Sequence, residues 1–175
     1  MIDRDTLFRD ARMEDAAELA KVGRETFIET FGHLYPAADL RAYLDHTYSF
    51  ETASRELADP AVEVRVALTG RKIVAYCKIG PVKLPADTGG LPSLELHRVY
   101  VYRDRQGVGV GRILLTWAIE RARQRGARQL FLGVWERNAR AIAVYESRGF
   151  ERAGTYKFAV GDTLDDEIIM RLKLA

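Results

Sequence analysis

The chain of 175 residues has one cysteine, three histidines and five prolines, and it lacks any long apolar run. A single cysteine, Cys77, excludes an intrachain disulfide and is typical of proteins of the reducing cytoplasm. Cys77 lies within a β-branched stretch, which favours a small buried residue over a nucleophile. His33, His46 and His97 lack the spacing of metal ligands, so we expect no metal site. Without an apolar segment of about 20 residues, no membrane span is expected.

The charge is nearly balanced, with 27 Lys and Arg against 25 Asp and Glu. This balance argues against the broad basic face of a nucleic-acid-binding protein. The charged start MIDRDTLFRDARMEDA has no apolar signal-peptide core, so we expect a cytoplasmic location. A local basic patch remains compatible with the composition, because several arginines gather around one glycine-rich stretch: Arg98, Arg103, Arg105 and Arg112.

Hydrophobic periodicity divides the chain into strands and helices, with no internal repeat and no domain boundary. The pattern predicts strands over residues 6–10, 62–68, 72–80, 93–101, 128–134, 151–160 and 166–174. It predicts helices over residues 13–31, 37–45, 49–59, 108–125 and 138–147. We therefore expect one mixed α/β domain over residues 1–175. The terminal strand is a candidate sheet edge through which two copies could pair, which leaves a homodimer open.

Three glycines at alternate positions, Gly107, Gly109 and Gly111, precede a helical run in RDRQGVGVGRILL. A P-loop is excluded because Arg112 stands where its second glycine is required. A dinucleotide fingerprint fails as well, because Arg112 or Leu114 would replace its third glycine. A glycine backbone lets a ligand approach closely, and N–H groups at a helix N-terminus point at negative charge. The stretch predicts a diphosphate site, with a glycine-rich helix start without ligand as the alternative.

The stretch resembles the pyrophosphate loop of the GCN5-related N-acetyltransferase (GNAT) family, whose signature is Gln/Arg-x-x-Gly-x-Gly/Ala between a strand and a helix. Five residues of NARAIAVYESRGF resemble the family's second cofactor element: Asn138, Ala141, Tyr145, Gly149 and Phe150. The resemblance implies a central mixed, mostly antiparallel sheet of about seven strands flanked by helices. It also implies a cofactor core over residues 93–150, with a cleft where the strands 93–101 and 128–134 splay apart.

By the same resemblance the co-substrate is acetyl-CoA, without a metal. The backbone of Val99, Tyr100 and Val101 would pair with the pantetheine arm as an added strand does. The resemblance assigns the diphosphate to Gln106, Gly107, Val108, Gly109, Val110, Gly111 and Arg112. Asn138 begins a helix, where its amide can cap the helix or reach the pantetheine arm. Tyr145 lies about two turns further on and can face the same groove.

Acetyl transfer from a thioester to an amine requires that the amine lose a proton and that the leaving thiolate receive one. Glu95, eleven residues before Gln106, lies where the family has a catalytic glutamate that relays the proton through water. The alternative for Glu95 is a structural ion pair, for instance with Arg98. His97 shares a strand face with Glu95 and is the reserve base. Tyr145 matches the family's proton donor, and the alternative is a core tyrosine that contributes only its ring.

A narrower likeness covers almost the whole chain, because ETFIETFG, RAYLDHTYS and VGDTLDDEIIM resemble PaiA-like acetyltransferases, whose reported substrates include spermidine and spermine. It implies a small-molecule primary amine, such as a polyamine, as the acceptor. Acidic residues that could attract a polycation are Glu29, Asp39, Asp45, Asp162, Asp165, Asp166 and Glu167. The alternatives are a protein N-terminus, an amino acid or an amine antibiotic as acceptor, or a non-catalytic regulator that binds acyl-CoA.

Overall fold

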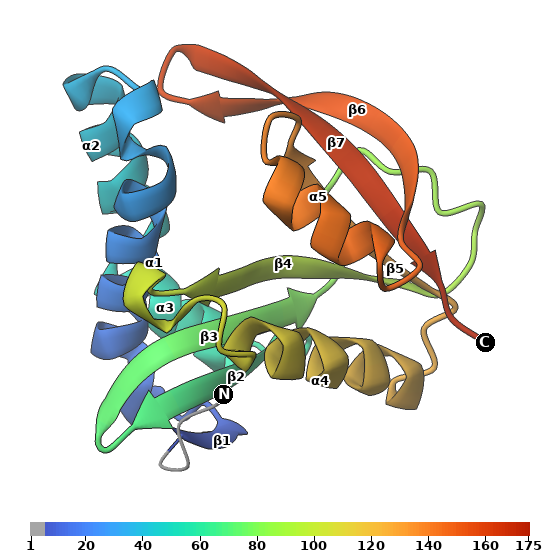
Figure 1. Cartoon of the computed structure of the whole chain (residues 1–175), viewed down its shortest axis with the longest axis horizontal. Coiled ribbons are helices and arrows are strands. Elements are labelled where there is room, and N and C mark those ends of the chain that lie inside the picture. Colours follow the sequence, from blue (N-terminus) through green and yellow to red (C-terminus); the bar gives the residue numbers. More distant parts are fainter. Residues whose placement is uncertain (1–5) are drawn as a thin grey trace.

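A twisted sheet of seven strands, in the order β1-β2-β3-β4-β5-β7-β6, organises the molecule (Figure 1). The computed structural model describes residues 6–175; residues 1–5, part of the predicted domain and of its charged start, lie outside the described residues. The strands are β1 (Thr6–Asp10), β2 (Glu63–Thr69), β3 (Lys72–Gly80), β4 (Ser93–Val101), β5 (Gln129–Trp135), β6 (Glu151–Val160) and β7 (Thr163–Lys173). Among these described strands only β4 and β5 pair in parallel, which confirms the predicted mixed, mostly antiparallel sheet.

Helices cover both faces of this sheet. They are η1 (Met13–Asp15), α1 (Ala16–Phe31), η2 (Gly32–Leu34), α2 (Ala37–Thr47), α3 (Phe50–Ala58), η3 (Arg103–Arg105), α4 (Val110–Gln124) and α5 (Ala139–Glu146). Local signals define their ends: Ser49 Oγ accepts a hydrogen bond of 3.0 Å from the Thr52 amide at the start of α3. Gly126, with φ of +76°, follows α4 in the left-handed conformation that favours glycine. The predicted helices are therefore confirmed.

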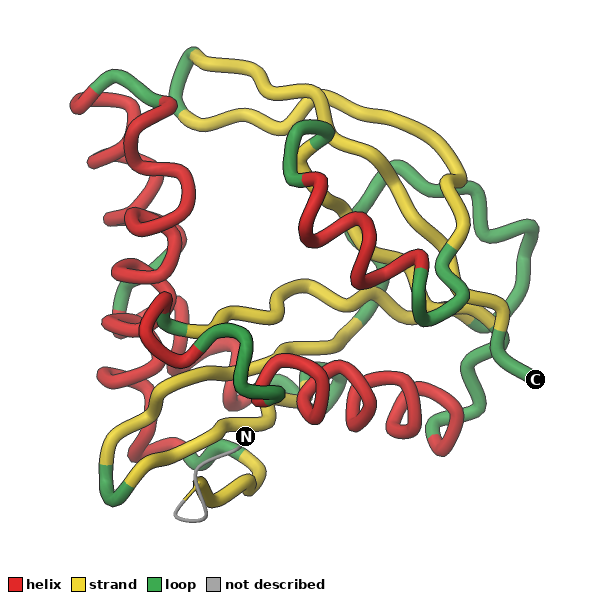
Figure 2. Tube along the Cα trace, viewed as in Figure 1, coloured by secondary structure: helices red, strands yellow, loops and turns green. Residues whose placement is uncertain are grey.

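The two faces of the sheet have separate hydrophobic clusters. Helices α4 and α5 cover one face, where Leu114 and Ile142 join Leu96 and Leu132 in the largest cluster. Helix α1 covers the other face, where Val22 packs against residues of β2 and β3. The tip of the β6–β7 hairpin reaches α2 (Figure 2), and Thr163 donates a hydrogen bond of 3.2 Å to Asp39 there. This hydrogen bond joins the β6–β7 hairpin, at one edge of the sheet, to α2.

The parallel pairing of β4 with β5 ends early. Ser93–Glu95 pair with Gln129–Phe131, and beyond these residues β4 pairs, within the described part of the chain, with β3 only. A bulge lies at His97, because Leu96 pairs with Ile79 whereas Arg98 pairs with Lys78. Such a bulge bends a strand and increases its local twist. The two strands therefore diverge, which confirms the predicted splay.

The prediction that the terminal strand forms a sheet edge is wrong. β7 lies between β5 and β6, so β6 forms the edge on this side of the sheet. The physical reason is the burial of both faces of β7, where Ile168, Ile169 and Met170 are all buried. Consecutive apolar side chains need cover on each face, which an interior position provides. The first half of β6, by contrast, is exposed over residues 151–155, so β6 is suited to the edge position of the sheet.

Candidate active site

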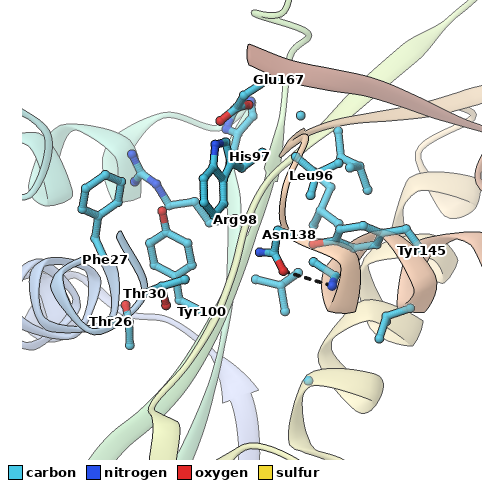
Figure 3. Close-up of a pocket in the computed structure, with 18 of the residues that line it drawn as sticks. Thr26, Phe27, Thr30, Leu96, His97, Arg98, Tyr100, Asn138, Tyr145 and Glu167 are labelled. Carbon is cyan, nitrogen blue, oxygen red and sulfur yellow. Dashed lines mark hydrogen bonds between the residues drawn. The ribbon is translucent and has the colours of Figure 1, made fainter. Parts of the chain in front are cut away.

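A cavity of about 1300 Å³ extends along both sides of β4 where β4 and β5 diverge. Ten predicted cofactor residues line it: Val99, Tyr100, Val101, Gln106, Gly107, Gly109, Gly111, Arg112, Asn138 and Tyr145. The two other predicted loop residues, Val108 and Val110, are not among the residues that line it, because Val110 is buried in the core and Val108 packs against that core. Figure 3 shows Asn138 and Tyr145 on one side of the central strands and Phe27 and Tyr100 on the other. We call these parts the glycine-loop side and the aromatic side.

Residues 106–112 form the glycine loop, and the last three of them are the first residues of α4. Gly107 has φ of +82° and Gly109 has φ of +102°, a conformation that a side chain would strain. Gln106 holds the loop: its Nε2 donates to the Val101 carbonyl at 3.0 Å, and its Oε1 accepts from Arg140 at 3.0 Å. No acidic residue occupies the first turn of α4, so its N–H groups and helix dipole favour an anion.

Asn138 and Tyr145 come from opposite ends of α5. Asn138 Oδ1 accepts a hydrogen bond of 3.1 Å from the Ala141 amide, so its carbonyl caps the helix (Figure 3). The Tyr145 ring packs edge-on against Phe150, with centroids 5.7 Å apart. Burial raises the pKa of the Tyr145 phenol, which is therefore protonated at neutral pH. The ring belongs to the core and the residue also lines the cavity, so a structural role and hydrogen-bond donation are compatible.

Glu95 is buried, with 8% of its surface exposed. Its Oε2 accepts hydrogen bonds from the amides of Lys83 at 2.6 Å and Leu84 at 3.0 Å, in the loop after β3. Burial raises the pKa of Glu95 and outweighs the opposing effect of these two bonds. Arg98, the ion-pair partner considered for Glu95, instead lies 3.9 Å from Glu56. Glu95 is therefore a buried carboxylate with a raised pKa, as a general base at neutral pH requires.

His97, the reserve base, is held at the bulge of β4. Its Nε2 donates a hydrogen bond of 2.9 Å to the Pro81 carbonyl. Burial lowers the pKa of His97 to about 4, so its imidazole is neutral at neutral pH. Glu95 and His97 are thus both held by the loop that follows β3.

Two acidic residues of β7 reach the aromatic side of the cavity. Glu167 Oε2 accepts a hydrogen bond of 2.5 Å from the Tyr156 hydroxyl, and Asp165 accepts one from the Tyr35 hydroxyl. Burial raises the pKa of Glu167. Asp165 and Glu167 were expected only as members of an acidic group, and their tyrosine partners were not predicted. The signal that could have found them is their alternation along the strand, which places both on one face.

The other acidic residues of the predicted group lie elsewhere. Asp166 pairs with Lys157 at 2.5 Å, and Asp45 pairs with Arg24 at 2.7 Å. Glu29 accepts a hydrogen bond of 3.1 Å from the Arg103 amide. Asp162 is exposed in the turn between β6 and β7. The cavity therefore receives only part of the acidic group that the sequence suggested.

A buried charged cluster, which the sequence did not predict, also lines the cavity. Lys78 has a side chain that is 3% exposed and that pairs with Glu56. Burial, together with nearby Arg98, lowers the pKa of Lys78 to about 7. The Arg98 guanidinium lies 4.8 Å from the centre of the Tyr48 ring, a cation–π contact. This cluster joins α3 to β3 and β4 beneath the aromatic side.

Three features bear on other kinds of chemistry. Cys77 is fully buried, and burial raises the pKa of its thiol, so the residue stays a neutral thiol that packs as a small apolar side chain. Within residues 6–175, no three His, Cys, Asp or Glu side chains gather as metal ligands. No helix in that part of the chain has both the length and the apolar character needed to cross a bilayer.

Comparisons with known proteins agree with this geometry. An uncharacterized N-acetyltransferase of Lactobacillus delbrueckii subsp. lactis is 28% identical over 161 residues, which cover 92% of this chain and 93% of the relative. The crystal structure of the PaiA N-acetyltransferase from Thermoplasma acidophilum, in complex with coenzyme A, matches with a TM-score of 0.77. It is 18% identical, and the match covers 97% of this chain and 99% of that chain.

A third comparison is with a ribosomal-protein-alanine N-acetyltransferase from Brucella melitensis, whose crystal structure is 30% identical with a TM-score of 0.68. The match covers 96% of this chain and 99% of that chain. Residues 24–150, well over half of the chain, match the family described as Acetyltransferase (GNAT) family. The chain therefore belongs to the GNAT acetyltransferase family and is an N-acetyltransferase.

Proposed function

We propose that the protein transfers the acetyl group of acetyl-CoA to a primary amine of a small molecule, a polyamine such as spermidine or spermine, by direct attack in a ternary complex. The observation that carries this proposal is the cavity that extends along both sides of β4. One side offers a glycine loop suited to a diphosphate, and the other offers carboxylates and aromatic rings suited to a cation. Glu95 and Tyr145 both line this cavity.

The residues present fit coenzyme A. The positive φ angles at Gly107 and Gly109 favour glycine, which leaves the loop backbone without side chains at these positions, and a Cβ on Gly107 would meet no atom within 4 Å. Such space suits the diphosphate. Beyond Glu95, no strand within residues 6–175 pairs with the edge of β4 that faces β5, so the backbone of Val99–Val101 can pair with the pantetheine arm. The thioester supplies an activated acetyl group when it is bound.

Glu95 and Tyr145 would supply the two proton transfers. As the amine nitrogen bonds to the acetyl carbonyl carbon, the carbon–sulfur bond breaks and nitrogen gives up a proton. Glu95 receives this proton through water, and its raised pKa suits a base that works near neutral pH. The Tyr145 hydroxyl donates to the departing sulfur, since its phenol is protonated at neutral pH.

The side chains of the aromatic side support a polyamine as the acceptor. Rings from α1, the loop after η2, α2 and β6 line it: Phe27, Phe31, Tyr35, Tyr43, Tyr156 and Phe158. Aromatic faces attract cations, and Asp165 and Glu167 add negative charge between the rings. A polyamine offers several ammonium groups and an aliphatic chain that match such a surface. The resemblance to PaiA-like enzymes supports the same acceptor class.

An amine panel tests this function. Purified protein with acetyl-CoA should release free thiol with spermidine or spermine, and mass spectrometry should identify the acetylated amine. The panel includes putrescine, amino acids, an aminoglycoside and a peptide that begins with alanine. Release with the peptide or an amino acid but not with polyamines would contradict the polyamine assignment. Binding of acetyl-CoA without turnover of any amine would favour the regulatory alternative.

A protein N-terminus is the second candidate acceptor. It is favoured by the likeness to the Brucella melitensis enzyme, whose name specifies a ribosomal-protein alanine. The alanine peptide in the panel separates the two candidates directly. A peptide acceptor would be acetylated with a higher kcat/KM than spermidine, whereas a polyamine enzyme would show the reverse.

A further inference from the structure

The hydrogen-bonded pair of Tyr156 and Glu167 lies where the sheet opens. Glu167 on β7 pairs with Trp135 on β5 and with Tyr156 on β6, so its side chain shares a face with both. The Tyr156 hydroxyl donates to Glu167 Oε2 at 2.5 Å, and both residues line the cavity. Figure 3 shows Glu167 among the side chains that line the cavity. A second carboxylate thus accompanies Glu95 at the divergence of β4 and β5.

Gly133 provides the space in which this pair lies. A Cβ built on Gly133 would be 2.5 Å from the Tyr156 hydroxyl oxygen and 2.8 Å from Glu167 Oε2. Real Cβ atoms do not approach so closely, so any larger residue would displace the pair. Gly133 is two residues beyond Phe131, the last residue of β5 that pairs with β4. The missing side chain therefore lets a carboxylate cover β5 at the start of the splay.

Glu95 and Glu167 are neighbours through Leu84. The Leu84 amide donates to Glu95, while its side-chain Cδ2 lies 3.3 Å from the same Cβ position on Gly133. After burial and Asp165, the negative charge of Glu95 further raises the pKa of Glu167. Within residues 6–175, no lysine or arginine lies against Glu167 to balance this charge. Lys83 and Lys78 lie close enough to Glu95 to lower its pKa, whereas the charges that act on Glu167 among the described residues are the carboxylates of Asp165 and Glu95. Glu167 therefore favours a positively charged ligand.

The two carboxylates differ in how many hydrogen bonds they already accept from the protein. Glu95 Oε2 accepts two backbone N–H groups, so half of its carboxylate holds the loop after β3. Glu167 accepts one hydrogen bond, from a hydroxyl that orients the carboxylate without neutralising it. A carboxylate of this kind forms strong charge-assisted hydrogen bonds with an ammonium group. Glu167 is therefore better placed to bind the substrate, and Glu95 to receive its proton.

We propose that Glu167, oriented by Tyr156 and given room by Gly133, binds the ammonium group of the acceptor amine that reacts. This inference rests on the proposed acetyl transfer to amines and adds the residue that selects the charge of the acceptor. The acceptor nitrogen then belongs to an aliphatic amine that arrives protonated, whereas an aromatic amine, neutral at the same pH, gains nothing from Glu167. The bound ammonium first releases one proton to solvent, and the neutral nitrogen then attacks the acetyl carbonyl carbon. Glu95 takes the second proton through water as the carbon–sulfur bond breaks.

The first test separates amine binding from chemistry. Glu167→Gln keeps the size of the side chain and removes its charge, so the KM for spermidine should rise about 10-fold or more. We expect kcat to change less, and the affinity for acetyl-CoA, measured by calorimetry, to stay at the wild-type value. Asp166→Asn is the matched control, because Asp166 lies on the same strand and pairs with Lys157 at 2.5 Å. Its KM should equal that of the wild type.

The second test asks whether Glu167 recognises the positive charge of the amine. Benzylamine, which is protonated at neutral pH, and aniline, which is not, have similar shapes and serve as competitors of spermidine acetylation. The inhibition constant of benzylamine should rise about 10-fold in Glu167→Gln, whereas that of aniline should stay unchanged. Gly133→Ala, which displaces the pair, should act like Glu167→Gln. Tyr156→Phe should have an intermediate effect.

Three results would overturn the inference. An unchanged spermidine KM in Glu167→Gln would show that the carboxylate does not bind the acceptor. Equal changes for benzylamine and aniline would show a structural effect rather than recognition of charge. A wild-type protein that acetylates no amine would overturn the proposed function and this inference together, whereas an active wild type with an unaffected variant overturns the inference alone.

Discussion

The two sides of the cavity are built in different ways. The glycine-loop side is lined by residues of one stretch of the chain, Val99–Arg112, which includes three glycines, and by residues of α4 and α5. The aromatic side consists of side chains from α1, α2, β4, β6 and β7, and one of its hydrogen bonds joins Tyr35 to Asp165 across 130 positions. A backbone site depends on local conformation, whereas a side-chain site depends on the whole topology.

The two sides also differ in charge. Arg112, Arg140 and Arg148 line the cavity beside the glycine loop. The aromatic side has the carboxylates of Asp165 and Glu167, and Lys78 and Arg98 beneath it lie beside Glu56. An anionic carrier and a cationic acceptor would thus be drawn to opposite parts of one space. Substitutions that affect one side and spare the other can therefore test this division.

The largest effect is expected from Glu95→Gln, which lies between the two sides. The variant keeps an oxygen that can accept from Lys83 and Leu84 but loses the basic carboxylate, so kcat should fall about 10²- to 10³-fold. The affinity for acetyl-CoA should be unchanged by calorimetry. A kcat close to the wild-type value would show that Glu95 is not the base.

The pH profile sharpens the same assignment. A base acts in its ionised form, so activity should fall as the pH drops through the pKa of Glu95. Because burial raises this pKa, the loss should occur above the ordinary range of glutamate. The profile of kcat/KM against pH measures this limb, and Glu95→Gln should abolish it. A limb that persists unchanged in the variant would assign it to another group.

Gly109→Val should break the glycine-loop side. Gly109 has φ of +102°, which strains a β-branched residue strongly, so the loop must change conformation. We expect the dissociation constant for coenzyme A to rise about 100-fold, equivalent to about 2.7 kcal/mol. Gly111→Ala is the control: its Cβ would lie 3.5 Å from Val101 Cγ2, an ordinary contact, so its affinity should stay within about three-fold.

Tyr145→Phe should have a smaller effect. The ring keeps its contact with Phe150, so stability should hardly change, but the sulfur loses its donor. We expect kcat to fall about 10- to 100-fold, with an unchanged affinity for acetyl-CoA. Steady-state kinetics over a range of acetyl-CoA concentrations measures both. A wild-type kcat would reduce Tyr145 to the packing role of its ring.

His97→Gln should have the smallest effect. The pKa of His97 is lowered to about 4 and its Nε2 is bonded to Pro81, so it neither gains nor gives a proton near neutral pH. Its replacement should change kcat/KM about two-fold or less above pH 6. Loss of the low-pH limb in His97→Gln, rather than in Glu95→Gln, would identify His97 as the base.

The features that could be predicted from the sequence follow the division between local conformation and overall topology that separates the two sides of the cavity. The strands, the helices, the glycine loop and the Asn138 cap depend on neighbouring residues, and their patterns were visible along the chain. The position of β7 was not, because a terminal hairpin can add to a sheet with either strand inside, and burial of Ile168–Met170 decides between them. The sequence predicts only that Gly133 belongs to a strand, because its role depends on Tyr156 and Glu167 from two other strands.

The most direct measurement of the central claim is a calorimetric comparison of coenzyme A with pantetheine, the part of the molecule that lacks the diphosphate. Both ligands are titrated into the wild type and into Gly109→Val. If the loop backbone binds the diphosphate, the variant should weaken coenzyme A about 100-fold and pantetheine about three-fold or less. Equal weakening of both ligands, or no binding of coenzyme A to the folded wild type, would contradict the account.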